Sequence, residues 1–152
     1  MPDKEALERA RHDEREGKAP SIQAGEFVRE EIEHIREGKD GARSTKQAIA
    51  IGLSKARRAG VKLRPPKKGT VSEETRRKAE KEYERAETGP RRSPSPKRGQ
   101  ASLKALRQES QGVVTKKSLS RQTQSASRRR SDADKSLAAK KAARTRAKGN
   151  RD

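Results

Sequence analysis

The scarcity of large apolar side chains limits what this chain can fold into more than any other feature. Leu, Ile, Val and Phe together make up 18 of its 152 residues, about 12%. A share below about 20%, combined with a high net charge, is typical of intrinsic disorder. The formal net charge at pH 7 is +19, and the chain has one Phe, one Tyr and no Trp. We therefore expect a mostly disordered chain with short α-helices and only a small core.

So small a core also excludes several classes of function. An enzyme needs a walled pocket that keeps water out, so we expect neither enzymatic activity nor a cofactor. The chain has no Cys, which excludes disulfides and cysteine zinc sites. No apolar run is long enough to cross a membrane, and the polar N-terminus does not resemble a signal peptide. These features predict a cytoplasmic protein.

Charge is distributed unevenly along the chain. Residues 1–37 have a net charge of −4, residues 38–69 of +9, residues 70–89 of −1 and residues 90–152 of +15. The last of these segments is rich in Ser, Arg, Lys, Gln and Ala and has almost nothing to bury. We therefore predict that residues 90–152 form a disordered basic tail.

The best-defined helices are predicted between residues 21 and 66, which we interpret as a helical hairpin module. One helix is expected over 21–37 and a second over 44–60, where Ser44 and Gln47 can form a capping box. The predicted core of the hairpin consists of the large apolar residues Phe27, Val28, Ile32, Ile35, Ile49, Ile51 and Leu53.

The second helix of the hairpin is apolar on two sides, because Ile51 lies nearly opposite Ile49 around the helix. Such a helix needs two partners. One is the helix over 21–37, and the other is either the following chain, folding back through Val61 and Leu63, or a second copy of the protein. A homodimer through the hairpin is our hypothesis, because about 44 residues is near the lower limit for independent folding.

Charged segments flank the hairpin on both sides. Residues 1–20 are expected to be partly helical, with a solvated, fraying helix over 3–16. Residues 70–88 are predicted to form a charged, solvent-exposed helix, because opposite charges recur four residues apart, as at Glu74 and Lys78.

The basic residues predict nucleic-acid binding, since spaced cations neutralise phosphates and release counterions. The helix over 44–60 is also basic, and in a helix-turn-helix the second helix enters the major groove. A small docking or dimerising unit is an equal alternative for this hairpin. The candidate nucleic-acid-binding residues are Arg43, Lys46, Lys55, Arg57, Arg58, Arg91, Arg92, Lys97, Arg98, Lys116, Lys117, Arg128, Arg129, Arg130, Lys140, Lys141, Arg144, Arg146 and Lys148.

The function predicted from these features is low-specificity DNA binding of the nucleoid-associated, histone-like kind. One alternative is an adaptor, in which the hairpin binds a protein partner or itself. Another is RNA association, although one Phe and one Tyr offer few rings for base stacking. A membrane is not an expected partner, because the tail has no apolar face.

A metal site is not predicted either. His34 lies on the same expected helix as Glu30, Glu33 and Glu37. One exposed histidine without a second His or Cys is more often a bystander than a ligand, so no metal ligand is assigned.

Residues 25–63 resemble an uncharacterised family of small, basic bacterial proteins. The shared pattern is a helix ending in R-E-G-K, followed by S-x-K-Q-A-I-A-I-G-L-S-K-A-R-R-A-G. The resemblance implies a bacterial, cytoplasmic protein and brings no established activity with it. In the tail, Ser95-Pro96-Lys97-Arg98 and residues 138–148 resemble the tails of linker histones and bacterial histone-like proteins. That second resemblance implies contacts between basic side chains and DNA.

Overall fold

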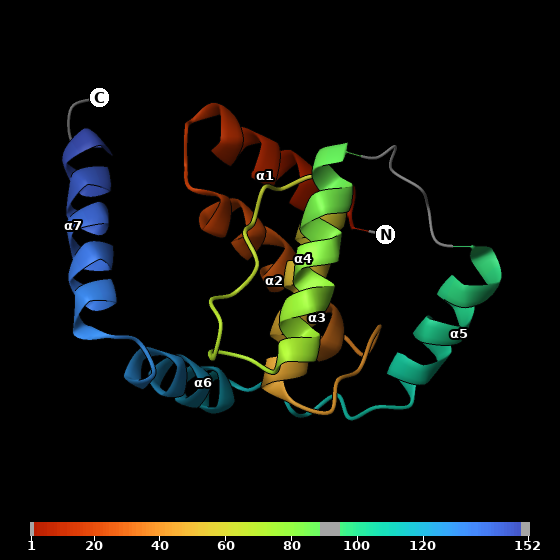
Figure 1. The fold of residues 1–152 in the computed structure, drawn as a ribbon. Coiled ribbons are helices and arrows are strands. Elements are labelled where there is room, and N and C mark those ends of the chain that lie inside the picture. Colours follow the sequence, from red (N-terminus) through yellow and green to blue (C-terminus); the bar gives the residue numbers. More distant parts are fainter. Residues whose placement is uncertain (1, 89–94, 150–152) are drawn as a thin grey trace. The chain divides into compact units, whose positions relative to one another are not determined.

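The computed structural model describes residues 2–88 and 95–149, which divide after Thr115 into two units. Within these residues the secondary structure is entirely helical (Figure 1). The first unit holds α1 (Lys4–Arg15), α2 (Pro20–Arg36), α3 (Thr45–Arg58), α4 (Glu73–Thr88) and α5 (Pro96–Arg107), and the second holds α6 (Lys116–Arg128) and α7 (Asp132–Gly149). No helix in the described parts is long and apolar enough to cross a membrane.

The prediction of a mostly disordered chain is wrong. Helices cover most of the described residues, and α5, α6 and α7 all lie in the segment 90–152 that the composition assigns to a disordered tail. The reason is local, because Ala, Leu, Lys and Arg favour helix wherever a cap starts one. At α5, the Ser95 hydroxyl oxygen accepts a hydrogen bond from the Arg98 N–H at 3.4 Å. A shortage of apolar residues limits the core without preventing helices.

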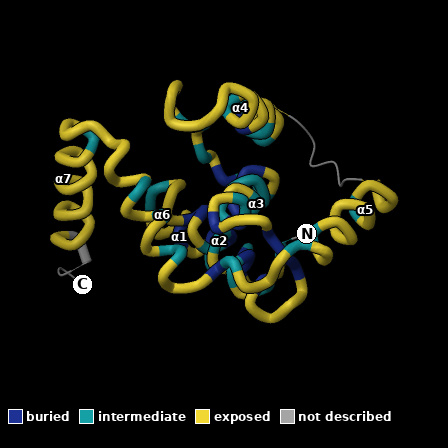
Figure 2. Tube along the Cα trace, turned by 90° about the horizontal axis from the view of Figure 1, so that it is seen from below, coloured by how far each residue is buried: buried dark blue, intermediate teal, exposed yellow. Residues whose placement is uncertain are grey.

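The core lies where α1, α2 and α3 meet (Figure 2). Phe27 is fully buried there, and Val61 and Leu63 fold back onto the same cluster from the end of α3. This fold-back is one of the two partners that the two-sided apolar pattern of α3 predicts. The remaining buried members of the cluster are all alanines, namely Ala6, Ala10, Ala24 and Ala56.

The first helix, α1, is not the solvated, fraying helix that its sequence predicts. Ala6 and Ala10 are buried in the core cluster. A salt bridge supports the packing, since Arg9 Nε lies 2.6 Å from Glu26 Oε2 on α2. A face of alanines lets two helices approach closely, so this helix packs with few large side chains.

The predicted hairpin core is buried less evenly than its apolar pattern suggests. Phe27 and Ile35 are fully buried, as are Ala48 and Ala56 on α3. Small residues occupy the centre because α2 and α3 approach each other closely at Gly52. The half-buried members of the predicted core are Val28, Ile32, Ile49, Ile51 and Leu53.

Gly52 marks the closest approach of α3 to α2. A Cβ atom added there would lie 2.6 Å from Val28 Cα and 3.0 Å from the Phe27 carbonyl oxygen. The backbones would have to separate, so Gly52→Ala is expected to destabilise the fold by about 1–3 kcal/mol in urea unfolding. Gly25→Ala on α2 is the matched control, because nothing lies within 4 Å of its added Cβ. It should stabilise by about 0.5–1 kcal/mol, and equal losses in both variants would contradict the close approach.

Residues 109–114, which we call the strap, complete the first unit by lying against the loop between α2 and α3. The Ala42 N–H donates a hydrogen bond to the Ser110 carbonyl oxygen at 3.1 Å. The Thr45 hydroxyl donates to the Val113 carbonyl oxygen at 3.0 Å. The first bond ties the backbone of the loop to the strap, and the second ties the side chain of the first residue of α3 to it.

Side chains hold the strap as well. Val114 is buried, and Arg36 Nε donates to its carbonyl oxygen at 3.3 Å. A Cβ atom at Gly41 would lie 2.5 Å from the Glu109 carbonyl oxygen, so the loop and the strap touch through their backbones. Asp40 is buried in the same loop. The strap therefore encloses the loop that joins the two hairpin helices.

The charged helix α4 docks on α3 through polar contacts. Glu82 Oε1 accepts hydrogen bonds from the Ser54 hydroxyl at 2.6 Å and from Arg58 Nη2 at 3.2 Å. Ala79 is buried on the same helix. The sequence predicts that this whole helix is exposed to solvent. In the structure only the face turned away from α3 is exposed.

Candidate functional site

The second unit concentrates positive charge. Residues 116–149 contain 12 Lys and Arg residues, against two acidic residues, Asp132 and Asp134. Through residue 147, where side chains are described, no residue of this unit is buried. The cations described there therefore face water, where a charged partner can reach them, and Lys135 Nζ also lies 3.2 Å from Asp132 Oδ1.

The cations of this unit lie on several sides of its helices. Lys117 and Arg121 are one turn apart on one face of α6. On α7, Lys140 and Arg144 share a face, whereas Arg146 lies roughly 120° away from Lys140 around the helix. Such an arrangement can contact phosphates from more than one direction and presents no single flat reading surface.

The structure leaves most of the predicted tail contacts open to solvent. Arg91 and Arg92 lie outside the described residues, as does the side chain of Lys148. The described candidates in the tail are all exposed, namely Lys97, Arg98, Lys116, Lys117, Arg128, Arg129, Arg130, Lys140, Lys141, Arg144 and Arg146.

The hairpin candidates have a different environment, because two of them point into the protein. Lys55 Nζ lies 2.6 Å from Glu31 Oε2, and both side chains are largely buried. Arg57 is 6% exposed, and its Nε donates to the Leu63 carbonyl oxygen at 3.2 Å. Burial lowers the pKa of the Arg57 guanidinium, an effect that Glu82 partly offsets. These two residues hold α3 in place and offer nothing to a phosphate.

The other hairpin candidates are nearer the surface. Lys46 is exposed at the start of α3. Arg43 Nε lies 2.6 Å from Glu109 Oε1 on the strap, a hydrogen bond that raises the Arg43 pKa. Arg58 pairs with Glu82 as described above. A recognition helix contacts base edges with its N-terminal residues, and here the strap covers part of that end of α3 through Thr45.

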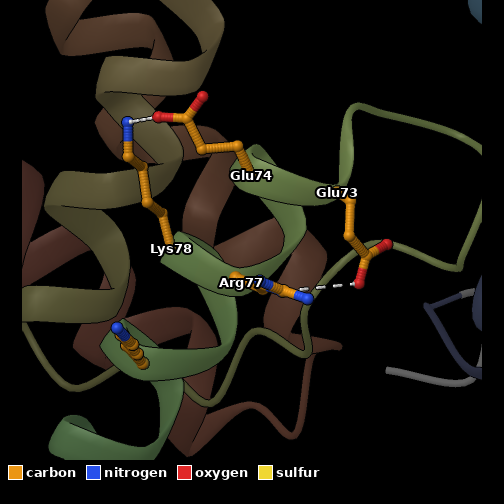
Figure 3. Close-up of a pocket in the computed structure, with 5 residues that line it drawn as sticks. Glu73, Glu74, Arg77 and Lys78 are labelled. Carbon is orange, nitrogen blue, oxygen red and sulfur yellow. Dashed lines mark ion pairs between the residues drawn. The ribbon is translucent and has the colours of Figure 1, made fainter.

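A surface depression on α4 is lined by side chains of both charges. Figure 3 shows its lining residues, in which Glu74 Oε1 lies 2.6 Å from Lys78 Nζ and Glu73 Oε1 lies 3.9 Å from Arg77 Nε. Both are the pairs that four-residue spacing predicts. All the lining residues come from one helix, and two Glu offset two of their three cations, so this depression is a weak candidate for a phosphate site.

Sequence reasoning misses the surroundings of His34. Its side chain is 14% exposed, and its ring nitrogens lie 2.9 Å from Asp3 Oδ2 and 3.6 Å from Asp40 Oδ2. Glu33 and Glu37, its expected neighbours, pair instead with cations at the surface. No local pattern reveals this, because Asp3 is 31 residues away in sequence and Asp40 is buried in the strapped loop.

The comparisons with known proteins identify one matching region. A family of unknown function, DUF6496, matches residues 23–68. This region contains most of α2, all of α3 and the segment that folds back onto the core, and it excludes the basic second unit. Neither the curated proteins nor the solved structures yield a match. Over its helical hairpin, the chain is therefore similar to a family whose function is unknown.

Proposed function

We propose that the protein binds duplex DNA with low sequence specificity, through phosphate contacts made by the basic unit of residues 116–149. The observation that carries the proposal is the excess of 12 Lys and Arg over two Asp in residues 116–149, where every Lys and Arg whose side chain is described is exposed. Cations spaced in this way neutralise phosphates and release counterions, which provides affinity without base contacts.

The same unit supports low specificity. Base readout needs side chains held rigidly enough to make paired hydrogen bonds to base edges. No residue among the described side chains of this unit is buried, so packing does not fix the direction of its cations. The Ala- and Lys-rich sequence of residues 138–148 also resembles histone-like tails, which supports a nucleoid-associated role.

Neutralisation of these cations also favours the helix that carries them. Like charges four residues apart, as at Lys140 and Arg144, oppose helix formation by about 0.2–0.5 kcal/mol per pair. Alanine is the best helix former, and five alanines follow Leu137 in α7. Contact with phosphates removes the repulsion between these cations, so the helix propensity of the alanines then stabilises α7.

A charge-removal variant tests where DNA is bound. In the full chain, six exposed cations of the second unit are replaced by Gln, at Arg128, Arg129, Arg130, Lys140, Lys141 and Arg144. Each lost phosphate contact reduces the slope of log K against log salt by about 0.9. We expect the slope, measured by fluorescence anisotropy on a short labelled duplex, to become shallower by about 5.

The matched control removes the same charge from the first unit, by Gln substitutions at the exposed residues Arg11, Arg15, Lys46, Lys62, Lys68 and Lys81. This control should change the slope by less than about 1. An equal effect of the two variants would show that the second unit is not the interface. Markedly tighter binding of a matched RNA duplex would favour RNA association, and a protein partner captured without any DNA binding would favour an adaptor.

A further inference from the structure

We infer that the first unit binds a divalent transition-metal cation, held by Glu31, His34 and Asp40. One ligand atom from each of these residues can be chosen so that all three lie within 4.8 Å of one another. Glu31 and His34 come from adjacent turns of α2, and Asp40 comes from the loop that the strap encloses. The inference stands independently of DNA binding.

The spacing of the donor atoms suits a metal. His34 Nδ1 lies 3.6 Å from Asp40 Oδ2. Two ligand atoms in a tetrahedral zinc site, with bonds of about 2.0–2.2 Å, are separated by roughly 3.4 Å. A cation between the imidazole and this carboxylate therefore needs only a small adjustment of the side chains.

Burial is the independent observation that points to a cation. Glu31 is fully buried; its Oε2 is ion-paired with Lys55 Nζ at 2.6 Å, whereas its Oε1 has no hydrogen-bond partner. Glu30 is 3% exposed, and its Oε2 also lacks one. A buried carboxylate oxygen without a donor is costly, since it has lost its hydration. A metal ion supplies the missing partner.

The nearby cations do not balance this charge. Lys55 Nζ lies 2.6 Å from Glu31 Oε2 and offsets one carboxylate. Lys39 pairs with Glu37 at 2.7 Å. The carboxylates of Asp3, Glu30 and Asp40 still surround His34. The cluster therefore holds more carboxylates than nearby cations, in a chain that is strongly basic overall.

The second ring nitrogen of His34 is oriented as it is in known metal sites. His34 Nε2 lies 2.9 Å from Asp3 Oδ2, so it can donate its proton to that carboxylate. Metal-binding histidines almost always donate their other ring N–H to a carboxylate, a backbone carbonyl or water, which fixes the tautomer and the ring. Asp3 is itself held, because its N–H donates to Glu30 Oε1 at 2.8 Å. We therefore assign Asp3 and Glu30 as positioning residues.

The donor set indicates the class of metal. Two carboxylates and one imidazole suit Zn²⁺ and its neighbours, whereas Ca²⁺ and Mg²⁺ prefer oxygen ligands alone. Because affinity rises from Mn²⁺ towards Zn²⁺ in such sites, Zn²⁺ should bind more tightly than Mn²⁺. The ion would connect α2 to the strapped loop, which makes its role structural.

Isothermal titration of the chelator-treated full chain with ZnCl₂ tests the inference. We expect one Zn²⁺ per chain, a rise in Tm on binding, and weaker binding of Mn²⁺ and Ca²⁺. Asp3→Asn should weaken Zn²⁺ binding by about 10–100-fold, which is the usual cost of losing a supporting carboxylate. His34→Gln removes a ligand and should weaken it by more than about 100-fold.

The matched control is His12→Gln. His12 also lies near two carboxylates, those of Asp13 and Glu16, but its ring and Glu16 are exposed. This variant should keep the Zn²⁺ affinity of the native chain, and circular dichroism should show that all three variants remain helical. Absence of Zn²⁺ binding, equal losses for His12→Gln and His34→Gln, or equal affinity for Ca²⁺ and Zn²⁺ would overturn the inference. Should His34→Gln fail to fold, the Asp3→Asn titration decides alone.

Discussion

Raising the monovalent salt concentration from about 50 to about 200 mM should weaken binding of the full chain to duplex DNA by about 10⁵-fold. The expectation follows from the second unit, which has 12 Lys and Arg residues against two acidic residues and whose described Lys and Arg side chains are all exposed. If roughly ten of the chain's basic residues contact phosphates, log K falls against log salt with a slope near −9. Anisotropy titrations at several salt concentrations measure this slope directly.

The slope separates electrostatic coating from base readout. Two duplexes of equal length and unrelated sequence should give the same slope and nearly the same affinity, because phosphates are common to both. A slope shallower than about −3 would contradict binding through the basic unit. A strong preference for one DNA sequence would instead favour base readout by α3, where Lys46 is exposed next to the helix N-terminus.

Replacing Phe27 by Ala should destabilise the first unit by about 3–5 kcal/mol. Phe27 is the only phenylalanine of the chain, and it is fully buried at the junction of α1, α2 and α3. Its buried neighbours are four alanines and Val61. Alanine side chains are too short to fill the cavity that the ring leaves, so repacking recovers little of the lost unfolding free energy. Because whole domains are stable by only about 5–15 kcal/mol, the variant should be close to unfolding.

Urea unfolding followed by circular dichroism measures this loss in the cooperative transition. Ile22→Ala is the matched control, since Ile22 lies on the same helix and is 43% exposed. It should change stability by no more than about 0.5 kcal/mol. A loss below about 1 kcal/mol for Phe27→Ala would show that the alanine cluster does not depend on the ring.

The hairpin could be recognised in the sequence because its signals are local. Ser44 caps α3, with its hydroxyl oxygen accepting from the Gln47 N–H at 3.2 Å, as the spacing predicts. Gly38 adopts a φ of +75° just after α2, a conformation that glycine adopts readily. Caps and turn residues act within a few positions of the chain, so a single sequence reveals them.

The sequence predicts only part of the candidate site. The excess of cations in the tail can be counted, and the described ones are exposed. The inward direction of Lys55 and Arg57 could not be read in the same way, because it depends on where Glu31 and Leu63 lie in space. The cluster around His34 joins residues from three segments, and no spacing rule connects Asp3 with Asp40.

The sequence by itself determined the positions of the hairpin helices, the charge of each segment and the smallness of the core. These properties depend on composition and on neighbours within about one helical turn. Only the tertiary structure decided that α1 packs through alanines, that the strap closes the loop between α2 and α3, and that carboxylates gather around His34. These features rest on close backbone approach, on hydrogen bonds to carbonyl groups that every residue carries, and on contacts between distant segments. None of them leaves a hydrophobic pattern in the sequence, so they can be described only once the distant segments are placed together.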